Sequence, residues 1–146
     1  MRRPLDGGLL AVLVWHYTAG MSTCILTTGA PKRIGFISTR FHGTDGVTLK
    51  ARKWAHILSG MGHTCFWMAG LIDAPPAVSH PAPLAYFNHP EVAEVQNKLF
   101  GVAVRGRAVT NQIHSLKERL KDELYRFIER FQLEVLIPEN ILSITM

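Results

Sequence analysis

The residues best suited to chemistry lie in a loop at residues 40–46, which reads RFHGTDG. It follows a short apolar run and opens directly into a helix-like segment. Its glycines allow the backbone to approach a ligand closely, and free amides at the start of the next helix favour an anion or a sugar hydroxyl. The spacing is not a complete G-x-G-x-x-G, and the lysine of a P-loop is absent. The candidate binding residues in this loop are Gly43, Thr44, Asp45 and Gly46.

Each charged side chain of the loop has both a chemical and a structural interpretation. Arg40 can bind phosphate or remain solvated, and His42 can act as a general base or be an exposed loop residue. Asp45 can bind a ligand, or either Thr44 or Asp45 can cap the helix that follows. A second polar pair, Glu139 and Asn140, comes after a late apolar run and is either part of a site or a solvated turn.

Apolar runs and helix-like segments alternate around the loop and predict an α/β fold. One run predicts a strand over residues 33–38, residues 47–59 have helical spacing, and residues 64–68 predict a second strand. Asp73 comes a few residues later and loosely matches the acidic residue that binds a ribose in dinucleotide sites. The helix is expected to bury Val47, Ala51, Trp54, Ala55 and Leu58.

The middle of the chain is harder to assign because prolines interrupt it. Residues 74–83 contain several prolines and predict a surface loop, and residues 84–87 predict a short third strand. Asn88 is expected to cap a helix that ends at Gly101.

The clearest helical pattern precedes the last predicted strand. Its apolar residues follow steps of three and four, which predicts a long helix packed on the sheet. Residues 133–137 then predict strand four. The stripe consists of Ile113, Leu116, Leu120, Leu124, Phe127, Ile128 and Phe131.

This alternation predicts a Rossmann-like parallel sheet of about four strands flanked by helices. In the common doubly wound order, strands one and four are neighbours, and ligands bind beyond their carboxyl ends. The loop at residues 40–46 and the pair Glu139 and Asn140 are therefore expected to face one crevice, although they are far apart in sequence.

Composition limits the classes of partner. The chain has 146 residues, a net charge of +5 and a pI near 9.6, but its positive charge is scattered. We therefore predict a solvated basic surface and no nucleic-acid partner, with phosphorylated substrates or peripheral contact with anionic lipid headgroups as alternatives. Two cysteines, Cys24 and Cys65, form no disulfide framework and suit the cytoplasm. The histidines lack zinc-site spacing, so we expect no metal. No cofactor is expected either.

The first residues are not expected to belong to the fold. Residues 1–31 predict an irregular extension, in which Arg2 and Arg3 precede the apolar run 9–15. This has the outline of a signal peptide, and the run is too short to span a bilayer. We expect Met21 to be the effective start, with export as the alternative.

Several motifs together resemble one enzyme family. Residues 34–47, which read IGFISTRFHGTDGV, and the Gly-His pair at residues 62–63 resemble the N-terminal half of a GT-B glycosyltransferase of the retaining group 1, or family 4, type. Residues 88–92 and 136–140 are similar to the continuation of the same half. The resemblance covers residues 33–146.

The resemblance implies a two-domain enzyme with a cleft between Rossmann-like halves. The N-terminal half of such enzymes mainly holds the acceptor, its first glycine loop approaches the phosphate and sugar of the donor, and the C-terminal half holds most of the nucleotide-sugar. That second half is missing here, so residues 32–146 are expected to form a truncated acceptor-side domain that is inactive alone. The substrate-binding residues that carry over are Gly43, Thr44, Asp45, Gly46, Glu139 and Asn140, and no catalytic residue is assigned.

Two further expectations accompany this interpretation. The partners would be a nucleotide-sugar donor and an acceptor, bound once a C-terminal domain completes the site, and strand four would leave an exposed sheet edge suited to self-association. The alternative is a stand-alone Rossmann-like module that binds a nucleotide or phosphate without catalysis.

Overall fold

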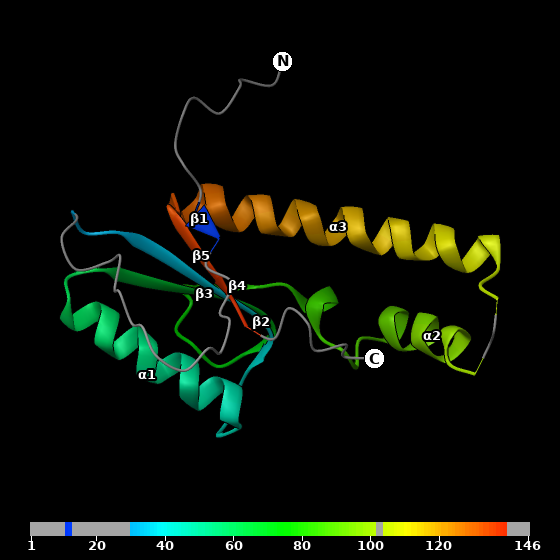
Figure 1. The fold of residues 1–146 in the computed structure, drawn as a ribbon, viewed down its shortest axis with the longest axis horizontal. Coiled ribbons are helices and arrows are strands. Elements are labelled where there is room, and N and C mark those ends of the chain that lie inside the picture. The colour runs from blue at the N-terminus through cyan, green and yellow to red at the C-terminus, as the bar shows by residue number, and fades with distance from the viewer. Residues whose placement is uncertain (1–10, 13–29, 102–103, 140–146) are drawn as a thin grey trace, which may run out of the picture.

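The chain folds as a parallel α/β sheet flanked by helices (Figure 1). The computed structural model describes residues 11–12, 30–101 and 104–139. Its principal strands are β2 (Arg33–Phe41), β3 (Thr64–Ile72), β4 (Ser79–Pro81) and β5 (Val135–Pro138), and β1 (Ala11–Val12) joins β5. The order is β1-β5-β2-β3-β4, and every pair is parallel. This confirms the predicted Rossmann-like class.

The strand order reverses at β2, as predicted. The chain leaves β2 toward β3 and β4 on one side, and it returns to pair β5 with the other side of β2. The register aligns Ile34 with Val135 and Ile37 with Pro138. The carboxyl ends of β2 and β5 are therefore neighbours at one edge of the sheet, where Rossmann-like folds bind ligands.

Helices cover both faces of the sheet (Figure 1). Helix α1 (Gly46–Gly60) packs on one face through Thr48, Ala51, Ala55 and Leu58. The prediction that Trp54 would join this buried stripe is wrong, because its side chain is 40% exposed. The small residues on the core face of α1 allow the helix to lie close to the aromatic side chains of the strands, Phe36, Phe41 and Trp67.

The long helix α3 (Arg107–Phe131) covers the opposite face (Figure 1). Its predicted stripe is buried at the C-terminal end, where Phe127 and Phe131 pack with β3 and β5. Gly35 permits this packing, because a Cβ there would lie 2.6 Å from the Leu133 side chain and 2.8 Å from the Phe127 ring. The N-terminal half of α3 extends beyond the sheet and packs with α2 (Pro90–Leu99) (Figure 1).

The proline-rich segment was predicted incorrectly. Strand β4 forms at residues 79–81, inside the predicted loop, and residues 83–85 form the 3-10 helix η1 where a strand was expected. A proline is tolerated in β4 because this strand is at the edge of the sheet, and its outer side donates no ladder hydrogen bond. Helix α2 begins after His89, so Asn88 is not its cap.

The ends of the chain lie largely outside the described residues. The irregular extension predicted over residues 1–31 lies outside the described residues, apart from residues 11–12 and 30–31. Strand β1 pairs with Val135 and Leu136 of β5, along the edge that was predicted to be exposed. Among the helices of the described residues, none has the length and apolar character needed to cross a bilayer.

The amino-terminal edge of the sheet is closed by a polar network. Lys32 Nζ lies 2.7 Å from Glu134 Oε1, and Glu134 Oε2 accepts a hydrogen bond from the Arg33 amide at 3.1 Å. Buried His63 accepts the Lys32 amide through Nδ1 at 3.0 Å. These contacts fix the starts of β2, β3 and β5 relative to one another.

Candidate functional site

The candidate site is the carboxyl-terminal edge of β2 and β5. The loop at residues 40–46 leaves β2 here and enters α1, and Glu139 follows β5. The Glu139 amide donates to the Ile37 carbonyl at 2.8 Å, which continues the β2–β5 ladder to the corner. The structure therefore brings the two predicted regions to one edge, although Asn140 lies outside the described residues.

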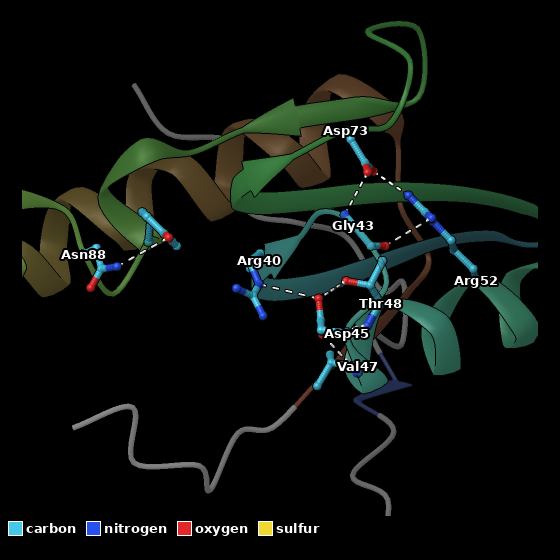
Figure 2. Close-up of polar contacts among 9 residues, drawn as sticks. Arg40, Gly43, Asp45, Val47, Thr48, Arg52, Asp73 and Asn88 are labelled. Carbon is cyan, nitrogen blue, oxygen red and sulfur yellow. Dashed lines mark hydrogen bonds and ion pairs between the residues drawn. The ribbon is translucent and has the colours of Figure 1, made fainter.

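Asp45 is the N-cap of α1 (Figure 2). Its Oδ1 accepts hydrogen bonds from the amides of Val47 and Thr48 at 3.1 and 3.2 Å, and its Oδ2 accepts the Thr48 hydroxyl at 2.7 Å. The Thr48 hydroxyl, its amide and the nearby Arg40 guanidinium lower the pKa of the Asp45 carboxyl below its usual value. Free amides were expected at the start of this helix, but the carboxylate of Asp45 already accepts the amides of Val47 and Thr48.

Asp73 holds the loop from the end of β3 (Figure 2). Its Oδ2 accepts the Gly43 amide at 3.0 Å, and its Oδ1 lies 2.5 Å from a guanidinium nitrogen of Arg52. The Gly43 amide and Arg52 lower the pKa of the Asp73 carboxyl. Gly43 has φ of 73°, a conformation that favours glycine. Asp73 thus has a structural partner at each oxygen, so its contacts hold the loop in shape and leave neither oxygen free for a ribose.

The other loop candidates differ in exposure. Arg40 is half-buried and forms an ion pair with Asp45, with its Nε 3.5 Å from Oδ2. His42, Thr44 and Gly46 are exposed at the edge. These exposed groups can meet a ligand, whereas Arg40 and Asp45 already interact with each other.

Glu139 is the most unusual side chain at this edge, since its carboxylate is nearly buried. Only 6% of the side chain is exposed, and Oε2 lies 2.5 Å from Nζ of Lys50. Lys50 belongs to the second turn of α1, so this ion pair connects the helix after the loop with the end of β5. An ion pair of this kind offsets the cost of removing a carboxylate from water.

An apolar groove of about 380 Å³ lies beside this carboxylate. The ends of β2 and β5 form its floor, and α3 supplies one wall through Leu120 and Leu124. Glu139 lines the groove, whereas residues 40–46 do not contribute to its lining. The remaining lining residues are Ile37, Ser38, Thr39, Met68, Ala85, Lys121 and Pro138. An apolar cleft with few charged groups is the usual form of a small-molecule site.

Sequence reasoning missed the contributions of Lys50 and the groove-lining residues of α3. Lys50 lies on the polar side of a predicted helix, and only the strand order reveals that it reaches Glu139. Leu120 and Leu124 belong to an apolar stripe that predicts core packing. Nothing in the sequence indicates that they are half-exposed and line a groove beside the strand ends. The described residues contain no group of three His, Cys, Asp or Glu that could hold a metal ion.

Comparisons with protein-family models, with curated proteins and with solved structures found no match to this chain. The function is therefore inferred from the geometry of the site and from the sequence motifs at residues 40–46 and 136–140.

Proposed function

We propose that the chain is the N-terminal, acceptor-side domain of a GT-B glycosyltransferase. It would take part in transfer of a sugar from a nucleotide-sugar donor only together with a donor-binding domain. The observation that carries the proposal is the position of the Glu139 carboxylate, nearly buried at the switch between β2 and β5 and lining a groove. The glycine loop opens at the same edge, where a donor held by a second domain could approach it.

In this proposal the groove holds the acceptor. The apolar part of the acceptor lies against Ile37 and Leu124, and a hydroxyl donates a hydrogen bond to Glu139. Lys50 holds that carboxylate in place through their ion pair, so it is a positioning residue. The exposed His42 and Thr44 remain available to groups of the donor.

The alternative, a nucleotide- or phosphate-binding module, has less support from the loop. Phosphate sites at helix starts need free backbone amides. The amides of Val47 and Thr48 are both bound by Asp45, which also carries negative charge at the position that a phosphate would occupy. Like charges at this position disfavour a phosphate.

The proposal is tested by titrating the ¹⁵N-labelled chain with hexyl β-glucoside, as an acceptor probe, and with UDP-glucose. We expect the glucoside to shift the amide signals of residues 37–39 and 139 with millimolar affinity. Glu139→Ala should weaken this binding about fivefold or more, because it removes a charged hydrogen-bond acceptor. Glu129→Ala is the matched control, since Glu129 is exposed on α3 and does not line the groove.

UDP-glucose is expected to give no saturable shifts in this experiment. Micromolar binding of UDP-glucose that shifts residues 43–48 would overturn the acceptor-side proposal and support the nucleotide-binding module. Glucoside binding that Glu139→Ala leaves unchanged would remove the role given to this carboxylate.

A further inference from the structure

The outward face of α1 carries large apolar side chains that no described element covers. Leu49 is 51% exposed, Trp54 40% and Ile57 42%, and Met61, the C-cap residue, is 38% exposed. Single exposed apolar residues are ordinary, but a contiguous set on one helix marks an interaction surface.

The spacing places these side chains on one surface of the helix. Leu49, Ile57 and Met61 are separated by eight and four residues, so they align along the helix, and Trp54 lies beside them. This surface is opposite the face that packs on the sheet. The packed face consists of Thr48, Ala51, Ala55 and Leu58. Helix α1 is thus apolar on both its buried face and part of its outward face.

Among the described residues, Lys53 is the basic side chain of this surface that has no carboxylate partner. The outward face includes Lys50, Arg52 and Lys53, all exposed, and residues 46–72 contain no aspartate or glutamate. Lys50 and Arg52 form ion pairs at the carboxyl edge, with Glu139 and Asp73 respectively. Lys53 lies between Leu49 and Ile57 in the four-residue repeat, so a cation interrupts the apolar row.

The exposed tyrosine of α3 has different surroundings. Tyr125 is 47% exposed, and its charged neighbours at three- and four-residue spacing carry both signs, namely Lys121, Asp122 and Glu129. Exposed apolar side chains and a lysine that has no carboxylate partner among the described residues therefore coincide at α1, whereas the charges around Tyr125 are mixed.

We propose that the outward face of α1, defined by Leu49, Lys53, Trp54, Ile57 and Met61, docks on an anionic lipid bilayer. The apolar side chains enter the interface between headgroups and acyl chains, with tryptophan in the position it favours. The Lys53 ammonium extends along its stem to a lipid phosphate. A protein partner fits less well, because protein interfaces are depleted in lysine.

Docking in this way would fix the position of the candidate site. Helix α1 starts at the carboxyl-terminal edge, where Asp45 caps it, and Leu49 lies one turn further on. With α1 flat on the bilayer, the loop at residues 40–46 would face the headgroup layer. This surface is independent of the groove, so the membrane proposal and the acceptor proposal can fail separately.

The first experiment is flotation of the full chain with vesicles of phosphatidylcholine, with or without about 30% phosphatidylglycerol. We expect binding to the anionic vesicles only, and release at about 500 mM salt, where charge interactions are screened. The double variant Leu49→Ser/Ile57→Ser should bind at least about tenfold more weakly, and Lys53→Glu at least about fivefold more weakly. Tyr125→Ser is the matched control and should bind like the parent chain.

A second measurement locates the contact. Brominated acyl chains in the anionic vesicles should quench part of the tryptophan fluorescence, and Trp54→Phe should remove that quenching. Circular dichroism of each variant should match the parent, because these side chains are exposed. Equal binding to neutral and anionic vesicles, no binding to either, or quenching that persists in Trp54→Phe would each overturn the proposal. An equal loss of binding in Tyr125→Ser would also overturn it.

Discussion

The two edges of the sheet carry similar polar chemistry but differ in what lies beside it. At the amino-terminal edge, Glu134 joins Lys32 and the Arg33 amide. At the carboxyl-terminal edge, Asp45 and Asp73 likewise join amides to basic side chains. In both places a carboxylate satisfies backbone donors at strand or helix ends. Such a network is therefore ordinary structural chemistry and does not identify a site.

The difference between the edges is the groove and the buried carboxylate beside it. Side chains of Lys32 and Glu134 are 39% and 42% exposed, whereas the Glu139 side chain is 6% exposed and lines a groove of about 380 Å³. Burying a charge is costly without a partner, and a buried charge facing a groove is a common feature of functional sites. The comparison teaches that Glu139, rather than the glycine loop, carries the argument for function.

The largest loss of stability is expected from Gly70→Ala, which disrupts packing in the carboxyl-terminal half of the sheet. A Cβ at Gly70 would lie 2.1 Å from the Tyr86 amide nitrogen and 2.5 Å from its Cα. The backbone after η1 must move, so we expect a loss of about 3 kcal/mol in the free energy of unfolding. Urea unfolding followed by circular dichroism measures this loss.

Gly35→Ala is the counterpart in the amino-terminal half. Its Cβ would meet only side chains, Leu133 and Phe127, so the expected loss is smaller, about 2 kcal/mol. A Gly35→Ala loss equal to or larger than that of Gly70→Ala would contradict this ranking, because it would mean that the backbone near Tyr86 moves more easily than the core of α3.

A smaller effect is expected from His63→Ala at the amino-terminal edge. The substitution removes the acceptor of the Lys32 amide and leaves space where a buried ring was packed, so we expect a loss of about 1 to 2 kcal/mol. His56→Ala, on the exposed side of α1, is the control and should change stability by less than about 0.5 kcal/mol. Glucoside binding should be unaffected in folded His63→Ala, and a weakened affinity would break the distinction between the edges.

Much of the fold could be predicted because its main elements have clear periodicity. The strands at residues 33–38 and 64–68, both long helices and the position of β5 beside β2 follow from apolar spacing and from the handedness of parallel crossovers. Strand β4 could not be predicted, because three residues that end in a proline look like a loop unless the neighbouring edge is known. Trp54 was wrongly predicted to be buried because helical spacing puts it at the border of the apolar stripe. The face of α1 that packs on the sheet is centred on small residues, and this leaves Trp54 exposed.

The edge at which the candidate residues lie was predicted, but their contacts were not, and the loop at residues 40–46 does not line the groove beside Glu139. Strand order alone brings Glu139 to the edge where the loop begins, and a place before a helix indicates that Thr44 or Asp45 caps it. The Lys50–Glu139 pair and the Asp73–Gly43 hydrogen bond join residues 89 and 30 positions apart, so they depend on how α1 and the loop before it lie against the ends of β5 and β3. No local pattern encodes such contacts.

The smallest expected effect is the pH dependence of the unfolding free energy, which should have the same direction at both edges of the sheet. The Thr48 hydroxyl and amide lower the pKa of Asp45, and Lys32 with the Arg33 amide lowers that of Glu134. A carboxyl whose pKa is lower in the folded state stabilises the fold above its ordinary pKa, near about 4, and this stabilisation is lost as the pH falls through the lowered value. Asp45→Asn keeps a capping oxygen but does not titrate, so its deficit in unfolding free energy, under about 1 kcal/mol, should shrink between pH of about 6 and about 3. Glu134→Gln should show the same direction in urea titrations at both pH values. A deficit that grows with acid in Asp45→Asn but not in Glu134→Gln would show that the two networks differ in kind, and the glycine loop would then regain a functional interpretation.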